Sequence, residues 1–210
     1  DTAVPDVAAD AGSSAADAGN TTEAETPAAD TTAEAPAADS AAAITTNSIS
    51  GWPQASDITS TAAIVMETST NTVLFSKNAD QQLYPASAVK IMTCLIALEN
   101  SSLDDQVTMT ATGVSGVTDG GANISAQLDE VFTMEQCLYA IMVGSANDLA
   151  LQVAEHVGGS VEAFVEKMNA RAQELGCPNT VFTHPTGLPA ENQHITAHDM
   201  PMIIETAIET

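Results

Sequence analysis

A twelve-residue segment from Ser87 to Leu98, SAVKIMTCLIAL, carries apolar side chains on all sides of a helix. A helix without a continuous polar face is stable only when neighbouring elements cover it, so this segment predicts a buried helix. Lys90 lies within it, although the chain of 210 residues contains only four basic residues. A buried ammonium group is costly unless it finds partners or gives up its proton.

The spacing of Ser87 and Lys90 indicates a chemical role for this lysine. Residues three apart lie on the same helical face, and burial lowers the pKa of a lysine until its neutral amine acts as a base. A base of this kind turns a serine hydroxyl into a nucleophile, and the positive end of a helix favours the anion formed on an attacked carbonyl. The pattern therefore predicts Ser87 as nucleophile and Lys90 as base. It leaves open a simpler interpretation, in which Lys90 extends from the core to place its amine in water.

A second set of polar residues, Ser145 and Asn147, follows the apolar segment LYAIMV at 138–143. A hydroxyl at this point can relay a proton to a leaving group, and an asparagine amide both donates to and accepts from a peptide-like substrate. The S-x-N pattern is weak by itself, because it also occurs at 69–71 and 76–78. Only the copy at 145 stands at a helix end, where a turn directs side chains into a cleft, so we add Ser145 and Asn147 to the candidate site.

Ahead of the buried helix, the runs 62–67 and 72–76 are short, apolar and partly β-branched, and the sequence TSTN separates them. This pattern predicts a β-hairpin. A two-stranded hairpin is marginally stable alone, and no strand partner is evident after residue 77 except a short piece at 181–183. We therefore expect either that the hairpin packs on helices only or that further strands lie beyond Thr210.

Capping signals predict helices after residue 130. Thr133 and Gln136 have the spacing of a capping box. Ser160 opens a segment with apolar side chains at helical spacing, which Gly176 ends.

A last helix is expected to be capped by Thr196 and Asp199, with Pro201 removing one of its early hydrogen bonds. The predicted order is thus one hairpin followed by helices.

Residues 1–50 differ in composition from the rest of the chain. They consist mainly of Ala, Thr, Asp, Glu and Ser, with nine acidic residues and no lysine, arginine or aromatic residue. So little bulky apolar surface cannot offset the ordering entropy, and we expect a disordered acidic linker. Such a segment serves as a spacer between an anchoring point and a working domain, or is a tail without a role. Residues 51–210 suffice for one domain with a core.

The formal net charge of −24 argues against several functions. Nucleic-acid binding needs clustered Lys and Arg, and anionic lipid headgroups would also repel this surface. No apolar run approaches the roughly 20 residues that span a bilayer. The chain begins with Asp1 and shows no leader pattern, so we expect a mature or trimmed product. Cys94, Cys137 and Cys177 lack metal-type spacing and are expected to be free thiols.

Several phrases resemble the serine D-Ala-D-Ala carboxypeptidases, the low-molecular-mass penicillin-binding proteins of peptidase family S11. In the family's order, the chain contains VLFSKNAD, YPASAVKIMT, LDDQVT, SANDLALQVAEHVGGS, FVEKMNARAQELG, NTVFTHPTGL and HITAHDM. The resemblance extends from about residue 57 to 208, and S-x-x-K followed by an S-x-N-type element is typical of penicillin-binding proteins.

The resemblance implies an α+β fold of the DD-peptidase and β-lactamase type, with an N-terminal hairpin and a helical subdomain in this chain. It implies that Ser87 is acylated, that Lys90 is the base, that Ser145 completes the catalytic set and that Asn147 binds substrate. The implied reaction needs no cofactor and releases D-alanine from bacterial peptidoglycan stem peptides outside the cytoplasmic membrane. The implied ligands are those stem peptides and β-lactam antibiotics, with membrane attachment only through an anchor outside this chain.

The sequence departs from the family at GGANIS (120–125), which differs from the family's usual glycine- and serine-rich phrase, and more importantly at a missing triplet. K-T-G is absent, because Lys77, Lys90 and Lys167 are followed by Asn, Ile and Met. In the family this triplet binds the substrate's terminal carboxylate, and its strand supplies an oxyanion-hole donor, a contact that contributes about 10²–10³ in rate. We therefore expect that the natural protein continues beyond Thr210, with the sheet's later strands, and that the chain as written is a weak catalyst or none. Reading the coding sequence past that codon tests this expectation.

Three other functions stay open at this point. A serine β-lactamase would share the acyl-enzyme, but the E-x-x-L-N phrase of the class A enzymes is absent. A metal hydrolase would require His194, His198 and Glu191 to converge, although His194 lies outside the predicted last helix. A non-catalytic wall-binding protein would keep the fold without the chemistry, yet the presence of all four site residues argues against it.

Overall fold

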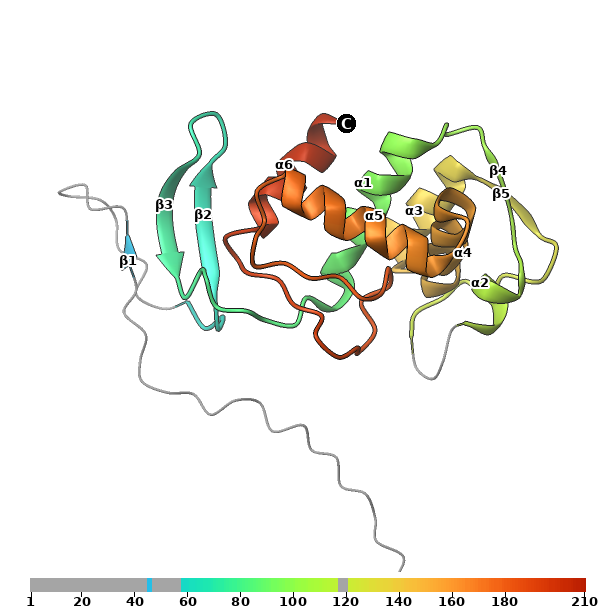
Figure 1. The fold of residues 1–210 in the computed structure, drawn as a ribbon, viewed down its shortest axis with the longest axis horizontal. Helices are drawn as coiled ribbons and strands as arrows, with labels where there is room; N and C mark the ends of the chain where they lie inside the picture. The colour runs from blue at the N-terminus through green and yellow to red at the C-terminus, as the bar shows by residue number, and fades with distance from the viewer. Residues whose placement is uncertain (1–44, 47–57, 117–120) are drawn as a thin grey trace, which may run out of the picture. The chain divides into compact units, whose positions relative to one another are not determined.

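The computed structural model describes residues 45–46, 58–116 and 121–210. It combines antiparallel strands with helices, which confirms the expected α+β class (Figure 1). Apart from residues 45–46, the predicted linker at 1–50 lies outside the described residues, so the linker and its boundary stay predictions.

The predicted hairpin is confirmed. It consists of β2, Ala63–Glu67, and β3, Thr72–Lys77, which pair antiparallel. The Glu67 carboxylate closes the turn by accepting hydrogen bonds from the backbone N–H groups of Ser69 and Thr70 at 3.0 and 2.9 Å. A further bond from the Thr70 hydroxyl, together with those from Ser69, lowers the pKa of Glu67 to about 2.

A third strand comes from upstream of the hairpin. β1, Thr45–Thr46, pairs antiparallel with β3, so the sheet order is β1–β3–β2. The expectation that the hairpin packs on helices only is therefore wrong, and β1 was missed because a two-residue strand is too short to show a pattern in the sequence. The expectation of further strands beyond Thr210 stays a prediction. The piece at 181–183 does not join this sheet, since Val181 forms an isolated bridge with His194.

The apolar segment forms the central helix of the fold. A 3-10 turn, Ala86–Ala88, leads into α1, Val89–Asn100, and Ser87 lies in that turn. Two hydrophobic clusters fill the space around α1, one mainly toward α5 and α6 and the other mainly toward α3 and α4. Neighbours on all sides explain why the segment has no polar face. The four helices that contact α1 are α3 (Met134–Gly144), α4 (Asn147–Gly158), α5 (Val161–Glu174) and α6 (Met200–Glu209).

Two predicted helices are confirmed together with their caps. Before α3, the Thr133 hydroxyl accepts from the Gln136 N–H at 3.2 Å, and Gln136 Oε1 accepts from the Thr133 N–H at 2.9 Å. Before α5, the Ser160 hydroxyl accepts from the Ala163 N–H at 3.1 Å. These bonds satisfy donors that a helix start leaves unpaired. Gly176 follows α5 with φ +75°.

The last helix, α6, begins at Met200, later than the sequence predicts. Thr196 Oγ1 accepts from the Asp199 N–H at 3.0 Å, but the Asp199 carboxylate does not cap α6 and instead accepts from the Thr180 hydroxyl at 2.8 Å. Pro201 falls in the first turn, where an N–H has no acceptor within the helix. The expected loss of a hydrogen bond at Pro201 therefore does not occur.

Besides β1, four further elements escape prediction. α4 has no side-chain cap at its start, so its first residues show no capping signal. The short helix α2 and the strands β4 and β5, which pair antiparallel, are too brief for a readable periodicity. The predicted order of one hairpin followed only by helices is thus wrong. The bounds of these three elements are β4 Gln106–Thr108, α2 Ala111–Ser115 and β5 Val131–Thr133.

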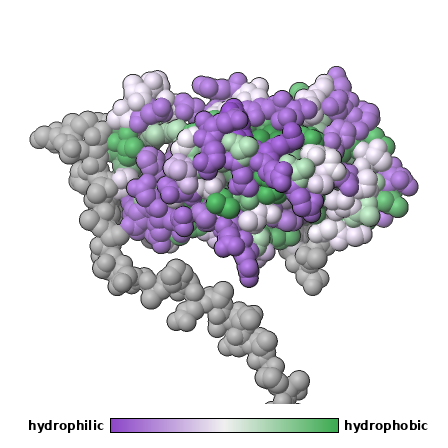
Figure 2. All heavy atoms as spheres, in the orientation of Figure 1, coloured by the Kyte–Doolittle hydropathy of each residue, from purple (hydrophilic) through white to green (hydrophobic). Residues whose placement is uncertain are grey.

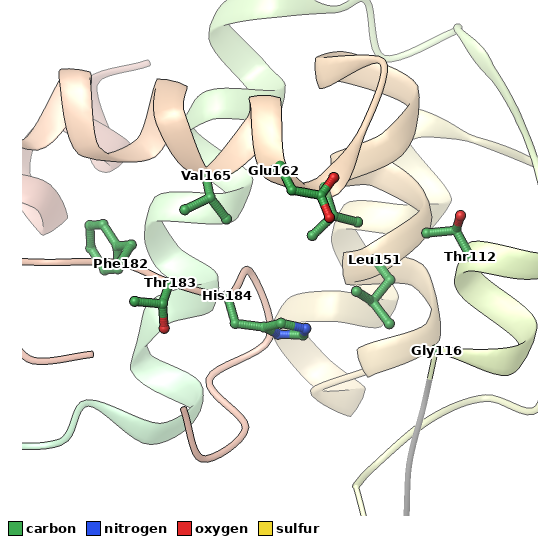
Figure 3. Close-up of a pocket in the computed structure, with 9 residues that line it drawn as sticks. Thr112, Gly116, Leu151, Glu162, Val165, Phe182, Thr183 and His184 are labelled. Carbon is green, nitrogen blue, oxygen red and sulfur yellow. The ribbon is translucent and has the colours of Figure 1, made fainter. Parts of the chain in front are cut away.

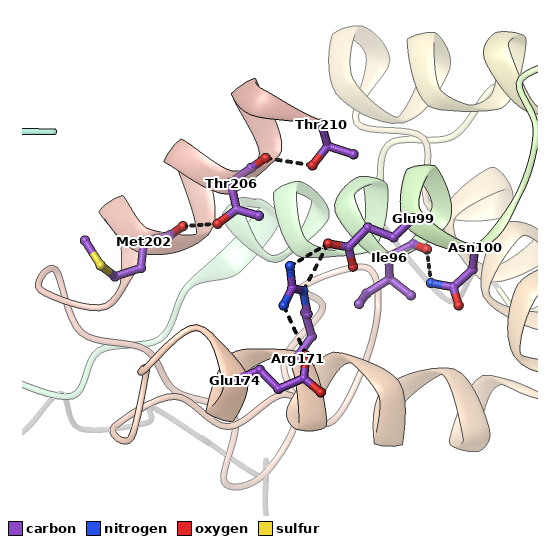
Figure 4. Close-up of polar contacts among 8 residues, drawn as sticks. All are labelled: Ile96, Glu99, Asn100, Arg171, Glu174, Met202, Thr206 and Thr210. Atoms are coloured by element: carbon purple, nitrogen blue, oxygen red, sulfur yellow. Dashed lines mark hydrogen bonds and ion pairs between the residues drawn. The ribbon is translucent and has the colours of Figure 1, made fainter. Parts of the chain in front are cut away.

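Among the described residues, ion pairs are few relative to the acidic charge. Arg171 on α5 donates to Glu99 on α1 at 2.8 Å and to Glu174 at 3.1 Å (Figure 4). All three side chains are partly exposed, and ion pairs of this kind contribute about 0–1 kcal/mol. The packing of α5 on α1 therefore rests on the hydrophobic cluster between them.

The face drawn in Figure 2 is mostly hydrophilic, with small and separate apolar patches. Within the described residues, no helix combines the length and apolar character that crossing a bilayer requires. Cys94, Cys137 and Cys177 are buried free thiols, and burial raises the pKa of each to about 12. They act as small core residues.

Candidate active site

The two predicted serines meet at the surface. Ser87 Oγ and Ser145 Oγ lie 3.2 Å apart, although 58 positions separate them in the sequence. Ser87 is exposed in the 3-10 turn that precedes α1, and Ser145 ends α3 in a left-handed conformation with φ 54° and ψ 32°. This conformation is costly for a residue with a Cβ and is typical of functional sites. The αL turn brings the Ser145 hydroxyl to Ser87.

Lys90, three residues after Ser87, is only 3% exposed, which rules out the interpretation that its amine reaches water. Its Nζ donates to Asn147 Oδ1 and to the Thr186 carbonyl, both at 2.6 Å. Desolvation by burial lowers the pKa of this amine. The contacts of Ser87 with Ser145 and of Lys90 with Asn147 thus bring the four predicted candidates together.

Asn147 is held in place by the segment before α3. The Asn147 N–H donates to the Ala122 carbonyl at 2.8 Å, and a Cβ on Gly121 would come within 2.2 Å of Asn147 Nδ2. Next to it, the buried Asp148 carboxylate accepts from the N–H groups of Ile124 and Ala126 at 3.1 and 3.2 Å. Asp148 therefore fixes this segment against the start of α4, and the glycine lets it approach the Asn147 amide.

Thr186 is a site residue that sequence reasoning misses. It contributes a backbone carbonyl, and a carbonyl is common to every residue type, so its position shows no signal. Its hydroxyl bonds His184 Nδ1 at 2.7 Å and accepts from the Leu188 N–H at 3.2 Å. The phrase HPTGL at 184–188 contributes to the family resemblance, and that was the available hint.

A pocket of about 600 Å³ opens beside His184, between α2, α4 and the start of α5 (Figure 3). Leu151, Val165 and Phe182 supply its apolar wall, and Glu162 stands at its rim. Burial, and then the charge of Lys90, lower the pKa of His184, so this imidazole is neutral near pH 7. Neither Ser87 nor Ser145 lines the pocket.

The proposed alternative metal ligands are engaged elsewhere. His198 Nδ1 pairs with Asp80 at 2.9 Å, and His194 Nδ1 lies 2.8 Å from the Asn192 carbonyl oxygen. Over residues 58–116 and 121–210, no group of three His, Cys, Asp or Glu side chains is arranged to hold a metal ion. The other two S-x-N copies, at 69–71 and 76–78, lie at the β2–β3 turn and at the end of β3.

Solved structures of a penicillin-binding protein and a DD-transpeptidase share this fold. Penicillin binding protein 5 from Haemophilus influenzae aligns with a TM-score of 0.70 and 31% identity, over 75% of this chain and 47% of that one. A mutant of Streptomyces K15 DD-transpeptidase aligns with a TM-score of 0.70 and 28% identity, over 73% of this chain and 63% of that one. The described residues therefore have the DD-peptidase fold. The D-alanyl-D-alanine carboxypeptidase model, peptidase S11, matches residues 47–210, and the chain belongs to this family.

Curated relatives agree with this membership. D-alanyl-D-alanine carboxypeptidase DacF of Bacillus subtilis is 36% identical over 153 residues, which cover 70% of this chain and 39% of the relative. A D-alanyl-D-alanine endopeptidase of Pseudomonas aeruginosa is 31% identical over 154 residues, covering 73% of this chain and 49% of the relative. The chain thus spans between about two fifths and one half of the length of these relatives.

Proposed function

We propose that this protein is a serine-type D-Ala-D-Ala carboxypeptidase that acts on peptidoglycan stem peptides and binds penicillin. The observation that carries the proposal is the buried amine of Lys90, which is held by Asn147 and Thr186 while the neighbouring residues Ser87 and Ser145 contact each other. A desolvated amine with a lowered pKa is the base that a serine nucleophile needs. Family membership supports the substrate class.

In the proposed reaction, neutral Lys90 takes the Ser87 proton as Oγ attacks the carbonyl between the two D-alanines. The amino end of α1 stabilises the resulting oxyanion electrostatically, because Ser87 lies at the positive end of this helix. Ser145 then passes a proton to the departing amine of the terminal D-alanine. Asn147 binds the peptide amide, and water later hydrolyses the Ser87 ester. The chemistry needs no cofactor.

The substrate class sets the location that we propose. Stem peptides are exposed outside the cytoplasmic membrane, so the protein works in the bacterial cell envelope. The acidic segment at 1–50, as a spacer, suits this location, and any membrane attachment depends on an anchor outside this chain. β-Lactams are expected to occupy the same site, since they acylate the nucleophilic serine of penicillin-binding proteins.

The first test is acylation of the product of the gene that encodes this chain. Incubation with a penicillin should add one drug mass, mapped to Ser87 by peptide mass spectrometry. Ser87→Ala should abolish the adduct, whereas Ser101→Ala at the far end of α1 should keep it. Absence of the adduct in the unsubstituted protein would contradict the proposal and leave the non-catalytic wall-binding protein. Rapid turnover of the drug would identify a β-lactamase.

A second candidate, a D-alanyl-D-alanine endopeptidase, is favoured by the similarity to the Pseudomonas relative. Both activities would use the same acyl-enzyme, so acylation does not separate them. Release of free D-alanine from a monomeric peptide ending in D-Ala-D-Ala indicates the carboxypeptidase. Cleavage of a cross-linked peptide dimer without that release indicates the endopeptidase.

A further inference from the structure

Three consecutive carbonyls, those of residues 185–187, are all held by side chains of the segment that contains Ser87. Thr93 Oγ1 donates to the Pro185 carbonyl at 2.7 Å, Lys90 Nζ to that of Thr186 at 2.6 Å, and the Tyr84 hydroxyl to that of Gly187 at 2.6 Å. We call residues 185–187 the strap. The strap is bonded on both sides of the point where it meets the lysine.

The backbone of the strap also packs directly on the nucleophile's turn. Gly187 has φ +79°, and a Cβ there would lie 2.0 Å from the Ala86 carbonyl oxygen. Ala86, with φ 47°, immediately precedes Ser87. The two residues that precede the strap, Thr183 and His184, are also held in place. Their N–H groups both donate to Gln193 Oε1 at 3.0 Å.

We propose that Thr93 and Tyr84 are positioning residues. Their hydrogen bonds hold the strap against the segment that contains Ser87 and thereby keep the Thr186 carbonyl at Lys90. The inference rests on the proposed function, because it assigns the strap the task of aiming the base at Ser87. Thr93 is fully buried one turn beyond Lys90, where a hydroxyl has no role in hydrophobic packing. A buried carbonyl without a partner is costly, so loss of the Thr93 hydroxyl should free the strap to shift.

A shifted strap has two consequences for Lys90. Its amine loses one of the two oxygens that fix its place, and misplacement of a catalytic group by about 1 Å lowers rates by up to about 10²-fold. The carbonyl also favours the charged ammonium, so its loss should lower the pKa of Lys90 further. Acylation needs the neutral amine, and the midpoint of its rise with pH should therefore move to lower pH.

The midpoint of the rise in acylation rate with pH should report the pKa of Lys90, because the groups around this amine are uncharged near neutral pH. Cys94, on the next turn of α1, has its pKa raised to about 12 by burial and stays a neutral thiol. His184, beside the strap, has its pKa lowered by burial and then by the charge of Lys90, so it is neutral near pH 7. Asn147, from α4, carries no charge.

The test compares Thr93→Val with Thr93→Ser in the gene product that contains this chain. The readouts are the penicillin acylation rate from pH 5 to 10 and the amide exchange of residues 186–188. Thr93→Val should slow acylation about tenfold, move its midpoint to lower pH and speed exchange in the strap. Thr93→Ser should restore all three, because it keeps the hydroxyl.

Two further variants keep the test decisive. Tyr84→Phe removes a bond from a half-exposed residue and should change the same readouts more weakly even if Thr93→Val does not fold. Ser101→Ala removes a hydroxyl that bonds the Ala97 carbonyl near the far end of α1 and should change none.

The outcomes separate the two claims. Unchanged strap exchange in both Thr93→Val and Tyr84→Phe overturns the inference. So does faster exchange with an unaltered rate and midpoint in a protein that is acylated. If the unsubstituted protein is not acylated at all, the proposed function fails, and the positioning role falls with it.

Discussion

At the scale of single residues, the space around Gly187 decides how closely two loops approach. Gly187 and Gly159 share φ +79°, but a Cβ would touch the Ala86 carbonyl at Gly187 and nothing within 4 Å at Gly159. The two positions therefore share one backbone strain and differ in one contact.

Alanine substitutions at these two glycines form a matched pair. Gly159→Ala should cost about 1–2 kcal/mol of unfolding free energy, the penalty of a left-handed L-residue. Gly187→Ala should cost more and should also slow acylation, because the Ala86 carbonyl must move and Ser87 follows it. Urea unfolding and penicillin labelling measure the two effects. Equal stability losses, with labelling unaffected in both, would show that the contact at Gly187 is of no importance.

Prediction from sequence worked at this scale where chemistry requires a side chain. The i,i+3 spacing of Ser87 and Lys90 indicated a nucleophile and a base, and the structure brings both beside Ser145 and Asn147. Thr186 was unpredictable because its carbonyl is generic. The role of Thr93 was equally hidden, since a threonine on an apolar helix shows nothing of its acceptor.

At the scale of elements, a polar clamp fastens α2 to α4. The Glu155 carboxylate accepts from the hydroxyls of Thr110 and Thr112 and from Gln152 Nε2, while the Thr110 N–H donates to Gln152 Oε1 at 2.8 Å. The bond from Thr110, followed by that from Thr112, lowers the pKa of Glu155 below its ordinary value of 4.5. The helices also approach closely, since a Cβ on Gly113 would meet the Asp148 carbonyl at 3.0 Å.

A carboxylate whose pKa is lower in the folded state stabilises the fold at pH values above its unfolded-state pKa. This stabilisation is lost as the pH falls through its folded-state pKa. Glu155→Gln should therefore lower the unfolding free energy at pH 7 by about 1 kcal/mol, a modest value because the side chain is partly exposed. The difference from wild type should shrink below about pH 4.5.

The measurement is urea unfolding of both proteins between pH 7 and 3. Glu166→Gln, which removes one exposed charge from α5, is the control for net charge. A difference between Glu155→Gln and wild type that stays constant over this range would contradict the clamp.

A capping side chain at the start made two of the helices predictable. Thr133 and Ser160 marked α3 and α5 correctly, whereas α4 begins without a cap and α6 begins after Thr196. Thr196 and Asp199 resembled a cap because both carry oxygen acceptors. The Asp199 carboxylate is instead used across the fold by Thr180, a contact that local sequence does not specify.

At the scale of the whole molecule, charge works against compactness. The chain carries 28 acidic and four basic residues, and one of those bases, Lys90, is buried. Mutual repulsion of surface carboxylates destabilises a compact state, and salt screens it over a Debye length that falls from about 30 Å at 0.01 M to about 3 Å at 1 M. The exposed pairs of Arg171 are too weak to offset this repulsion.

Raising NaCl from about 0.01 M to about 0.5 M should therefore raise the melting temperature by a few degrees. The measurement is thermal unfolding at pH 7, repeated with KCl so that a specific effect of sodium is distinguished from screening. A melting temperature that falls with both salts would mean that the ion pairs at Glu99 and Glu174 outweigh the repulsion.

By itself, the sequence determined the buried helix, the hairpin, two capped helices and the residue types of a serine–lysine site. Each of these follows from periodicity, capping chemistry or spacing, which act over a few neighbouring residues. Only the tertiary structure decided that β1 pairs with β3, that Ser145 reaches Ser87 and that the strap places a carbonyl on Lys90. Those contacts join backbone groups and side chains distant in the sequence, and their partners are set by how the helices pack around α1.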